Sequence, residues 1–220
     1  KHFTTICQAA NAGRVLDLKR NFLQSGIYIL HGDSDNVVPI QQVRQMREVL
    51  GTFHPDFCYY EYPGGSHWYS NESVDWKPIF DYFRWHKVPA AGEVKQLEFH
   101  TASPAISAKD YWVTINQQDT AYAFSSVSFK QTDNGISGTT SNVASLTFDL
   151  PALKLPSAAS ITIDNETMQA DGTKPAVLKK VSGKWTLVDE VSVTEKYPSR
   201  YGGFKQAFDN HVVFVYATGG

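Results

Sequence analysis

The first 88 residues alternate between strand-like and helix-like patterns of apolar positions. Residues 27–30 (Ile-Tyr-Ile-Leu) form a short apolar run, which is typical of a strand buried on both faces of a parallel sheet. Residues 39–51 begin with proline, keep one apolar face at helical spacing and end with glycine. This pattern predicts a helix directly after the first strand.

The same order then repeats. Residues 57–62 are rich in aromatic residues and precede Pro-Gly-Gly, so they predict a second strand. In residues 76–83 the bulky apolar residues recur at helical spacing, and Asp75 is placed to cap that helix. Because strand, helix, strand, helix is the order of an α/β unit, residues 1–88 are predicted to form an α/β domain with a mostly parallel sheet.

The helical period disappears after a linker at residues 88–92. Short strand-like runs separated by turn residues follow, and the last two flank Ser182-Gly183, which predicts a hairpin. The candidate strands are residues 94–99, 111–115, 127–130, 146–150, 161–164, 176–181 and 184–188. This spacing predicts an all-β, sandwich-like accessory domain over residues 89–200.

Residues 201–220 are predicted to begin a further segment or to supply a final strand. Residues 204–208 have a helical pattern, and residues 211–216 form a strongly apolar run followed by Ala-Thr-Gly-Gly. A strand of this buried type usually leads into further structure, so the expectation is that a natural chain continues.

The composition excludes several classes of function. Hydrophobic residues make up 42% of the 220 residues, enough for a sizeable core, and the formal net charge of -2 provides no broad basic field for nucleic acid. Cys7 and Cys58 are too few for a disulfide framework or a structural zinc site. No apolar run approaches the roughly 18 residues of a transmembrane helix. Without H-E-x-x-H, P-loop or G-x-G-x-x-G motifs, no catalytic metal or organic cofactor is indicated.

Two polar residues are predicted to meet at one edge of the parallel sheet. Asp35 lies in the turn after the first predicted strand, and His67 follows the second behind a glycine pair. One helix and one strand separate them, which returns the chain to the edge where the carboxyl ends of the strands lie. The Asp35 carboxylate could then accept the Nδ1–H of His67 and stabilise the imidazolium that forms when His67 removes a proton.

These residues also carry a family resemblance. The stretch His31-Gly32-Asp33-Ser34-Asp35, followed by Gly64-Gly65-Ser66-His67, resembles the acid and histidine segments of α/β-hydrolases, in particular the prolyl oligopeptidase and dipeptidyl-peptidase-like serine peptidases. In that family the carboxylate occupies the fifth position of the first stretch, which is Asp35 here, rather than Asp33. The resemblance implies that residues 1–88 are the C-terminal part of an α/β-hydrolase domain, with Asp35 and His67 as catalytic residues.

Structural interpretations stand beside this hypothesis. The Asp-rich turn could be an Asx-turn, and a histidine after glycines could be structural, as His31 is interpreted to be. Trp68 and Tyr69 could wall a substrate pocket or could simply pack. The sequence does not continue as a calcium-binding loop needs, because Val37 stands where another acidic or amide residue would be required.

No serine has the setting of a nucleophile. The α/β-hydrolase order is Ser, Asp, His, with the serine in a G-x-S-x-G elbow. Ser137 lies in Gly-Ile-Ser-Gly-Thr, which lacks the final glycine and follows the histidine, and Ser66 adjoins His67 along the chain. The chain is therefore predicted to be a fragment that is inactive alone, with its serine upstream.

The leading hypothesis is a serine peptidase that acts on peptides or esters. A carbohydrate esterase with the same triad is the alternative, as is a degenerate hydrolase whose β module binds carbohydrate or protein. For binding, the candidate aromatic platforms are Tyr111, Trp112, Tyr122 and Trp185, although aromatic residues in a sandwich belong mainly to its core. A short similarity of residues 203–216 to large bacterial multidomain peptidase-like proteins adds the expectation of an exported, periplasmic or extracellular protein. An incomplete sheet would also allow self-association.

Overall fold

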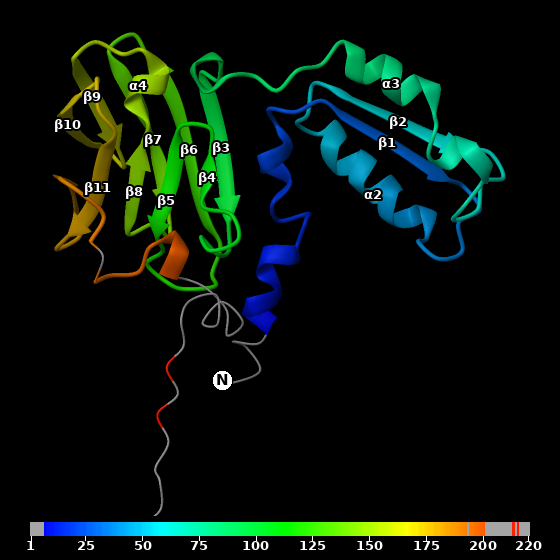
Figure 1. Cartoon of the computed structure of the whole chain (residues 1–220), viewed down its shortest axis with the longest axis horizontal. Helices are drawn as coiled ribbons and strands as arrows, with labels where there is room; N and C mark the ends of the chain where they lie inside the picture. Colours follow the sequence, from blue (N-terminus) through cyan, green and yellow to red (C-terminus); the bar gives the residue numbers. More distant parts are fainter. Residues whose placement is uncertain (1–6, 193, 201–212, 214, 216–220) are drawn as a thin grey trace, which may run out of the picture.

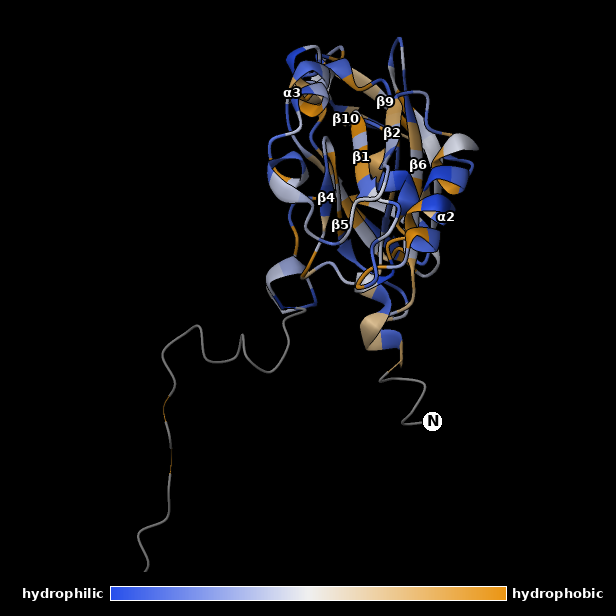
Figure 2. Cartoon of the chain, turned by 90° about the vertical axis from the view of Figure 1, so that its right-hand side faces the viewer, coloured by the Kyte–Doolittle hydropathy of each residue, from blue (hydrophilic) through white to orange (hydrophobic). Residues whose placement is uncertain are grey.

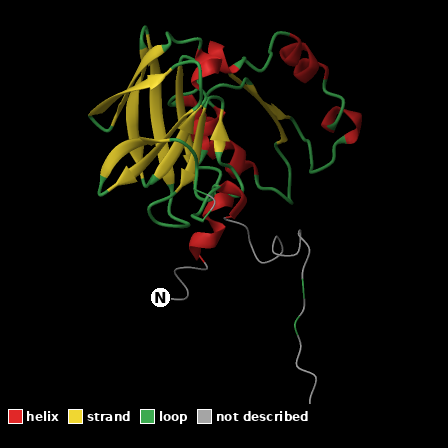
Figure 3. Cartoon of the chain, turned by 60° about the vertical axis from the view of Figure 1, so that its left-hand side comes forward, coloured by secondary structure: helices red, strands yellow, loops and turns green. Residues whose placement is uncertain are grey.

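The computed structural model describes residues 7–192 and 194–200, together with Val213 and Val215. Two five-stranded sheets face each other in one part of the molecule, and a two-stranded sheet flanked by helices forms the other (Figures 1 and 3). The expected helix at 204–208 and most of the expected strand at 211–216 lie outside the described residues. In the part of the chain that the structure describes, every helix is too short or too polar to cross a membrane.

The two-stranded sheet contains the segments that position the candidate site. Strands β1 (Ile27–Gly32) and β2 (Phe57–Tyr62) are parallel, and helix α2 (Ile40–Gly51) connects them. Helix α3 (Lys77–Arg84) follows β2 and lies on the opposite side of the sheet from α2 (Figure 1). The two predicted strands and both predicted helices are therefore present. Asp75 does not cap α3, however, because Trp76 occupies the N-cap position and no side chain bonds there.

The larger part is a β-sandwich. One sheet has the strand order β10-β9-β7-β6-β3 and the other β12-β11-β8-β5-β4. Neighbouring strands are antiparallel except β7 and β9, which are parallel and make the first sheet mixed. The strands are β3 (Gln96–Thr101), β4 (Lys109–Asp110), β5 (Val113–Gln117), β6 (Ser125–Thr132), β7 (Gly135–Ser141), β8 (Ser145–Phe148), β9 (Ala158–Ile163), β10 (Glu166–Asp171), β11 (Ala176–Val181) and β12 (Lys184–Val188).

Short helical turns complete the described chain. They are η1 (Ala10–Gly13), η2 (Lys19–Phe22), η3 (Ser70–Ser73), η4 (Ala91–Glu93), α4 (Leu150–Leu153) and η5 (Pro198–Arg200). The first two precede β1 and lie beside the outer strand β3 of the sandwich (Figure 1). There Asn21 donates its side-chain N–H to His100 O at 2.8 Å and accepts from His100 N at 2.7 Å. These bonds occupy backbone groups on the edge of β3 and join the two parts of the molecule.

The main hydrophobic core lies between the two sheets of the sandwich. At its centre the rings of Phe129 and Phe148 meet edge to face at 4.9 Å, and Trp112 packs beside both. Trp112 is completely buried and donates its indole N–H to Val94 O at 2.9 Å, so its polar atom is satisfied. Residues 7–88 contribute far less, since Ile40 and Leu50 are the only buried hydrophobic residues among those described there.

Figure 2 shows hydrophobic residues along β1 and mostly hydrophilic residues along α2. β1 pairs only with β2 among the described strands, and its residues are mostly half-buried rather than enclosed on both faces. An apolar groove of about 470 Å³ follows this strand and is lined in part by Ile29, Met46 and Phe83. Helices α2 and α3 lie on the two faces of the sheet, but the edge of β1 away from β2 has no neighbouring strand among those described. The expected burial of the first strand on both faces is therefore wrong in this structure, because its open edge leaves its residues half-buried.

The predicted fold class, a partial α/β-hydrolase with a mostly parallel sheet plus an all-β domain, is wrong. Of the described residues 34% are in strands and 23% in helices, and the helical part includes several short turns. Among the described strands, parallel pairing is confined to β1–β2 and β7–β9. Residues 27–84 have the local order strand, helix, strand, helix, but two strands do not make an α/β-hydrolase sheet.

Most predicted strands of the sandwich are present with shifted ends, and the hairpin at Ser182-Gly183 is confirmed by the pairing of β11 with β12. Three strands, β4, β7 and β10, and the helix α4 are not among the predicted elements. β7 contains Gly135 and Gly138, where an added Cβ would meet Ser160 O at 1.8 Å and Ser128 O at 2.0 Å. The neighbouring strands approach so closely at these two positions that glycine is required, although glycine has a low strand propensity. The predicted strand 146–150 ends at Phe148 because helix α4 begins at Leu150.

Candidate acid–base site

The two predicted site residues meet where β1 and β2 end. Asp35 lies three residues after β1, His67 lies five residues after β2, and His67 Nδ1 is 3.0 Å from Asp35 Oδ2. The Asp35 side chain is 4% exposed, whereas the His67 side chain is 37% exposed. The carboxylate is therefore enclosed, while the imidazole keeps one side toward solvent. Whether the pair takes part in catalysis stays a prediction.

Both oxygens of the Asp35 carboxylate are occupied. Oδ1 accepts the backbone N–H of Val37 at 2.8 Å and that of Val38 at 2.9 Å. Oδ2 faces His67 and also lies 3.4 Å from His31 Nε2. The first pair of bonds is the Asx-turn anticipated as the structural alternative, so the same side chain shapes its own turn and bonds to the histidine.

These contacts lower the pKa of Asp35. Burial of the carboxyl acts to raise the pKa, but the backbone N–H of Val38, the His67 ring and the N–H of Val37 outweigh it and bring the pKa to about 2. Asp35 is consequently ionised over the whole neutral range. An ionised acceptor at Oδ2 requires a proton on His67 Nδ1, which leaves Nε2 as the ring nitrogen that can accept a proton.

The loops that carry the two residues touch through their backbones at a pair of glycines. Asp33 N donates to Tyr62 O at 3.1 Å and Ser34 N donates to Gly65 O at 2.9 Å. A Cβ on Gly32 would lie 2.2 Å from Gly65 O, so only glycine permits this approach. Gly64 has a φ of 69°, in the left-handed region that favours glycine. The glycines thus bring the His67 loop within reach of Asp35.

Asp33 has a different task from Asp35. Its Oδ1 accepts the backbone N–H of Gly64 at 2.7 Å and the hydroxyl of Ser34 at 2.9 Å. The Asp33 side chain therefore fastens the turn after β2 to the turn after β1. It does not contact His67 in the described structure, in agreement with its being the less favoured candidate.

Aromatic residues support the His67 loop on one side and border it on the other. Tyr69 stacks on Tyr62 at 4.5 Å, so Tyr69 packs against the sheet. Trp68 is 72% exposed and its ring meets the His67 ring edge to face at 5.6 Å. Of the two aromatics, only Trp68 is available to contact a molecule that approaches His67.

His67 Nε2 bonds to no residue in the part of the chain that the structure describes. Ser66 donates its hydroxyl to Trp68 O at 2.9 Å and so is engaged elsewhere. Ser137 lies inside strand β7 of the sandwich, paired with Lys130 and Thr162 in neighbouring strands, and not in a turn between a strand and a helix. Neither serine occupies the position of a nucleophile relative to His67.

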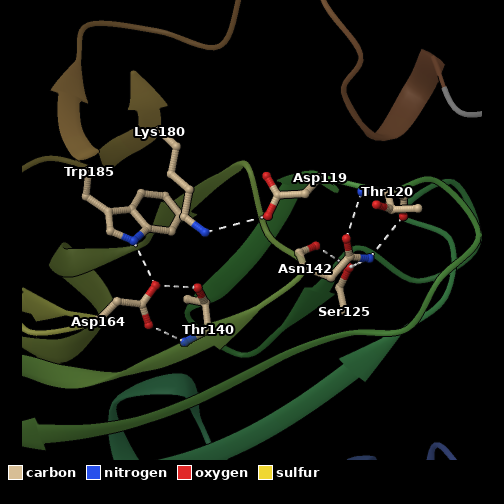
Figure 4. A network of polar contacts seen from close by, with 8 residues as sticks. All are labelled: Asp119, Thr120, Ser125, Thr140, Asn142, Asp164, Lys180 and Trp185. Atoms are coloured by element: carbon tan, nitrogen blue, oxygen red, sulfur yellow. Dashed lines mark hydrogen bonds and ion pairs between the residues drawn. The ribbon is translucent and has the colours of Figure 1, made fainter. Parts of the chain in front are cut away.

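A second polar cluster lies in the sandwich and is structural (Figure 4). Asp164 accepts the backbone N–H and the hydroxyl of Thr140, both at 2.7 Å, and the indole N–H of Trp185 at 2.9 Å. Lys180 lies 5.0 Å from the Trp185 ring centre and forms an ion pair with Asp119. All these bonds tie strands and turns together.

The predicted aromatic binding platforms do not form one surface. Trp112 is completely buried and Trp185 is 5% exposed, so neither can stack on a ligand. Both lie in the core of the sandwich, as the structural interpretation of these aromatic residues expects. Tyr111 packs against that core, and Tyr122 alone of the four is exposed.

Among the described residues no group of three or more His, Cys, Asp and Glu side chains is placed to hold a metal ion. Searches of protein-family models, of curated proteins and of solved structures found no match to this chain.

Proposed function

We propose that Asp35 and His67 are the acid–base half of a Ser-Asp-His triad in a serine peptidase or a related acyl hydrolase. One observation carries the proposal. Asp35 Oδ2 accepts a hydrogen bond from His67 Nδ1 at 3.0 Å, while His67 Nε2 has no partner among the described residues. This is the arrangement that a histidine needs to act as a general base. The nucleophilic serine then comes from outside the described residues.

The proposed reaction uses His67 twice. Nε2 removes the proton of the serine Oγ as that oxygen bonds to the carbonyl carbon of a peptide or ester. The resulting imidazolium is stabilised by Asp35, which is ionised because its pKa is about 2. Nε2–H then donates the proton to the departing amine or alcohol, and a second cycle with water releases the acyl group.

The geometry supports this function better than a binding role for the β-sandwich. A solvent-facing imidazole held by an enclosed carboxylate is built from two separate loops, and the glycine contact between Gly32 and Gly65 brings those loops together. The sandwich, in contrast, buries the tryptophans that a carbohydrate-binding face would display.

A serine-directed fluorophosphonate tests the proposal in the natural protein that contains this chain. We expect the probe to label one serine outside residues 7–200, and labelling to fall by at least about 10³-fold in the His67→Ala variant. His100→Ala is the matched control, because His100 also faces a carboxylate, at 3.2 Å from Glu98 Oε1, but lies in the sandwich. Absence of labelling in the folded natural protein would contradict a serine hydrolase.

Two further measurements complete the test: labelling of the isolated chain, and hydrolysis of peptide and ester substrates by the natural protein. Without a serine and an oxyanion hole the isolated chain is expected to remain unlabelled. Labelling of Ser66 or Ser137 in it would show that the nucleophile has been placed wrongly. Peptide and ester substrates given to the natural protein then separate a peptidase from an esterase.

A further inference from the structure

A second histidine, His31, also contacts the Asp35 turn. It is the last residue but one of strand β1, and its side chain is 14% exposed. Its Nε2 is 2.9 Å from Val38 O and 3.4 Å from Asp35 Oδ2. The sequence predicts only a structural role for His31.

The neighbours of His31 determine where its proton lies. A backbone carbonyl oxygen and an ionised carboxylate are both acceptors only, so Nε2 must carry the hydrogen that it donates to Val38 O at 2.9 Å. Asp35 Oδ2 lies 3.4 Å from the same nitrogen without forming a hydrogen bond to it. Both contacts lie in a poorly hydrated place, since the Asp35 side chain is only 4% exposed.

The contact to Val38 closes the turn that holds Asp35. Val38 N already donates to Asp35 Oδ1, and the carbonyl of the same residue accepts from His31. Val38 is therefore held by both of its backbone polar groups, one bonded to the carboxylate and one bonded to strand β1. This fixes the turn relative to the strand, and Oδ2 is left facing His67.

We propose that His31 is a positioning residue that holds the Asp35 turn and its carboxylate against strand β1, so that Oδ2 meets His67 Nδ1. The assignment rests on the proposed function for its catalytic meaning. His31 touches neither a reacting atom nor His67, and it acts through Asp35. Its loss frees the carbonyl of Val38 and opens Oδ2 to water, so Asp35 would orient His67 less strictly.

The unaltered 220-residue chain provides the first test. Nitrogen-15 NMR of the histidine rings distinguishes hydrogen on Nδ1 from hydrogen on Nε2. We expect His31 to carry its hydrogen on Nε2 and His67 on Nδ1 at a pH where both rings are neutral. A His31 ring with hydrogen on Nδ1 only would overturn the proposal, because Nε2 could then donate to neither acceptor. This measurement requires no variant to fold.

Two variants give the second test. His31→Phe removes the donor and keeps a ring, whereas His31→Gln offers an amide N–H in its place. We expect solvent exchange of the His67 Nδ1 hydrogen to become at least about tenfold faster in His31→Phe, as for loss of a hydrogen bond to a charged group, and to be largely restored in His31→Gln. His100→Phe is the control and is expected to leave His67 unchanged, because His100 contacts Glu98 instead.

The outcomes separate this proposal from the function. Unchanged exchange at His67 in a folded His31→Phe protein would overturn the positioning role, whatever the natural protein does with substrates. Conversely, failure of the natural protein to react with a fluorophosphonate would leave the ring measurements intact. In an active natural protein, His31→Phe is expected to lower kcat with little change in KM, and His31→Gln to recover most of the loss.

Discussion

Replacement of Gly32 by alanine tests the close contact that brings the two site loops together. A Cβ at position 32 would lie 2.2 Å from Gly65 O, 2.5 Å from Gly65 C and 2.6 Å from Ser66 O. All three are backbone atoms, so no flexible side chain can move aside. Ordinary contact begins near 3.4 Å, and the segment that leads to His67 must therefore retreat by about 1.2 Å.

That displacement exceeds what the Asp35–His67 bond tolerates. His67 Nδ1 lies 3.0 Å from Asp35 Oδ2, and a shift of about 1.2 Å away would bring the separation above 4 Å, where no hydrogen bond remains. The bond from Ser34 N to Gly65 O would be lost in the same movement. Overpacking of this kind costs about 1–3 kcal/mol of unfolding free energy.

Urea unfolding and NMR of the His67 ring measure the two effects separately. Gly64→Ala is the control: its φ of 69° is unfavourable for alanine, at about 1–2 kcal/mol, but nothing lies within 4 Å of the added Cβ. Both variants should therefore lose stability, and only Gly32→Ala should lose the protected Nδ1 hydrogen of His67. A Gly32→Ala protein that keeps this hydrogen protected as in the wild type would refute the reasoning.

Three further predictions concern stability, each measured by urea unfolding. Hydrogen bonds from Arg44, and to a smaller extent from Tyr59, lower the pKa of Glu61 to about 2. The wild type should therefore lose stability as the pH falls from about 4.5 towards 2, and Glu61→Gln should lose less. Parallel plots of unfolding free energy against pH for the two proteins would contradict this. Burial raises the pKa of Asp110 to about 6, so the stability of the wild type should fall as the pH rises from about 4 to 6. Asp110→Asn should be more stable than the wild type at pH 7 by about 1–2 kcal/mol, allowing for solvent screening, and as stable as the wild type near pH 3. Trp112→Ala should cost about 3–5 kcal/mol because the side chain is completely buried, and a cost below about 1 kcal/mol would show that the core is misplaced.

The site could be predicted from the sequence because its position follows from local order. Apolar runs fixed the ends of β1 and β2, and parallel pairing of the two strands brings Asp35 and His67 to the same edge. The glycines before His67 also indicated an unusual backbone path. The contribution of His31 could not be read in advance, because it depends on how the Asp35 turn folds back onto β1.

The fold class could not be predicted from the same local patterns. Residues 27–84 carry a strong α/β signal, but nothing in it says how many strands the sheet contains. In the sandwich, β10 (Glu166–Asp171) was missed because an edge strand of half-buried and exposed residues lacks a clear apolar pattern. The bond that holds Trp185 could not be predicted either, because the sequence does not show that Asp164 accepts its indole N–H inside the protein.

Asp35→Asn in the natural protein that contains this chain tests the central claim most directly. The matched control is Asp33→Asn, since Asp33 lies two residues away, binds Gly64 N and does not contact His67 in the described structure. If Asp35 fixes the proton on His67 Nδ1, hydrolysis of a reactive ester should fall by about 10⁴-fold in Asp35→Asn, because the amide disturbs the tautomer, and by less than about tenfold in Asp33→Asn. Equal rates for the two variants, or no hydrolysis by the wild type, would contradict the assignment of Asp35 and His67 as a catalytic acid–base pair.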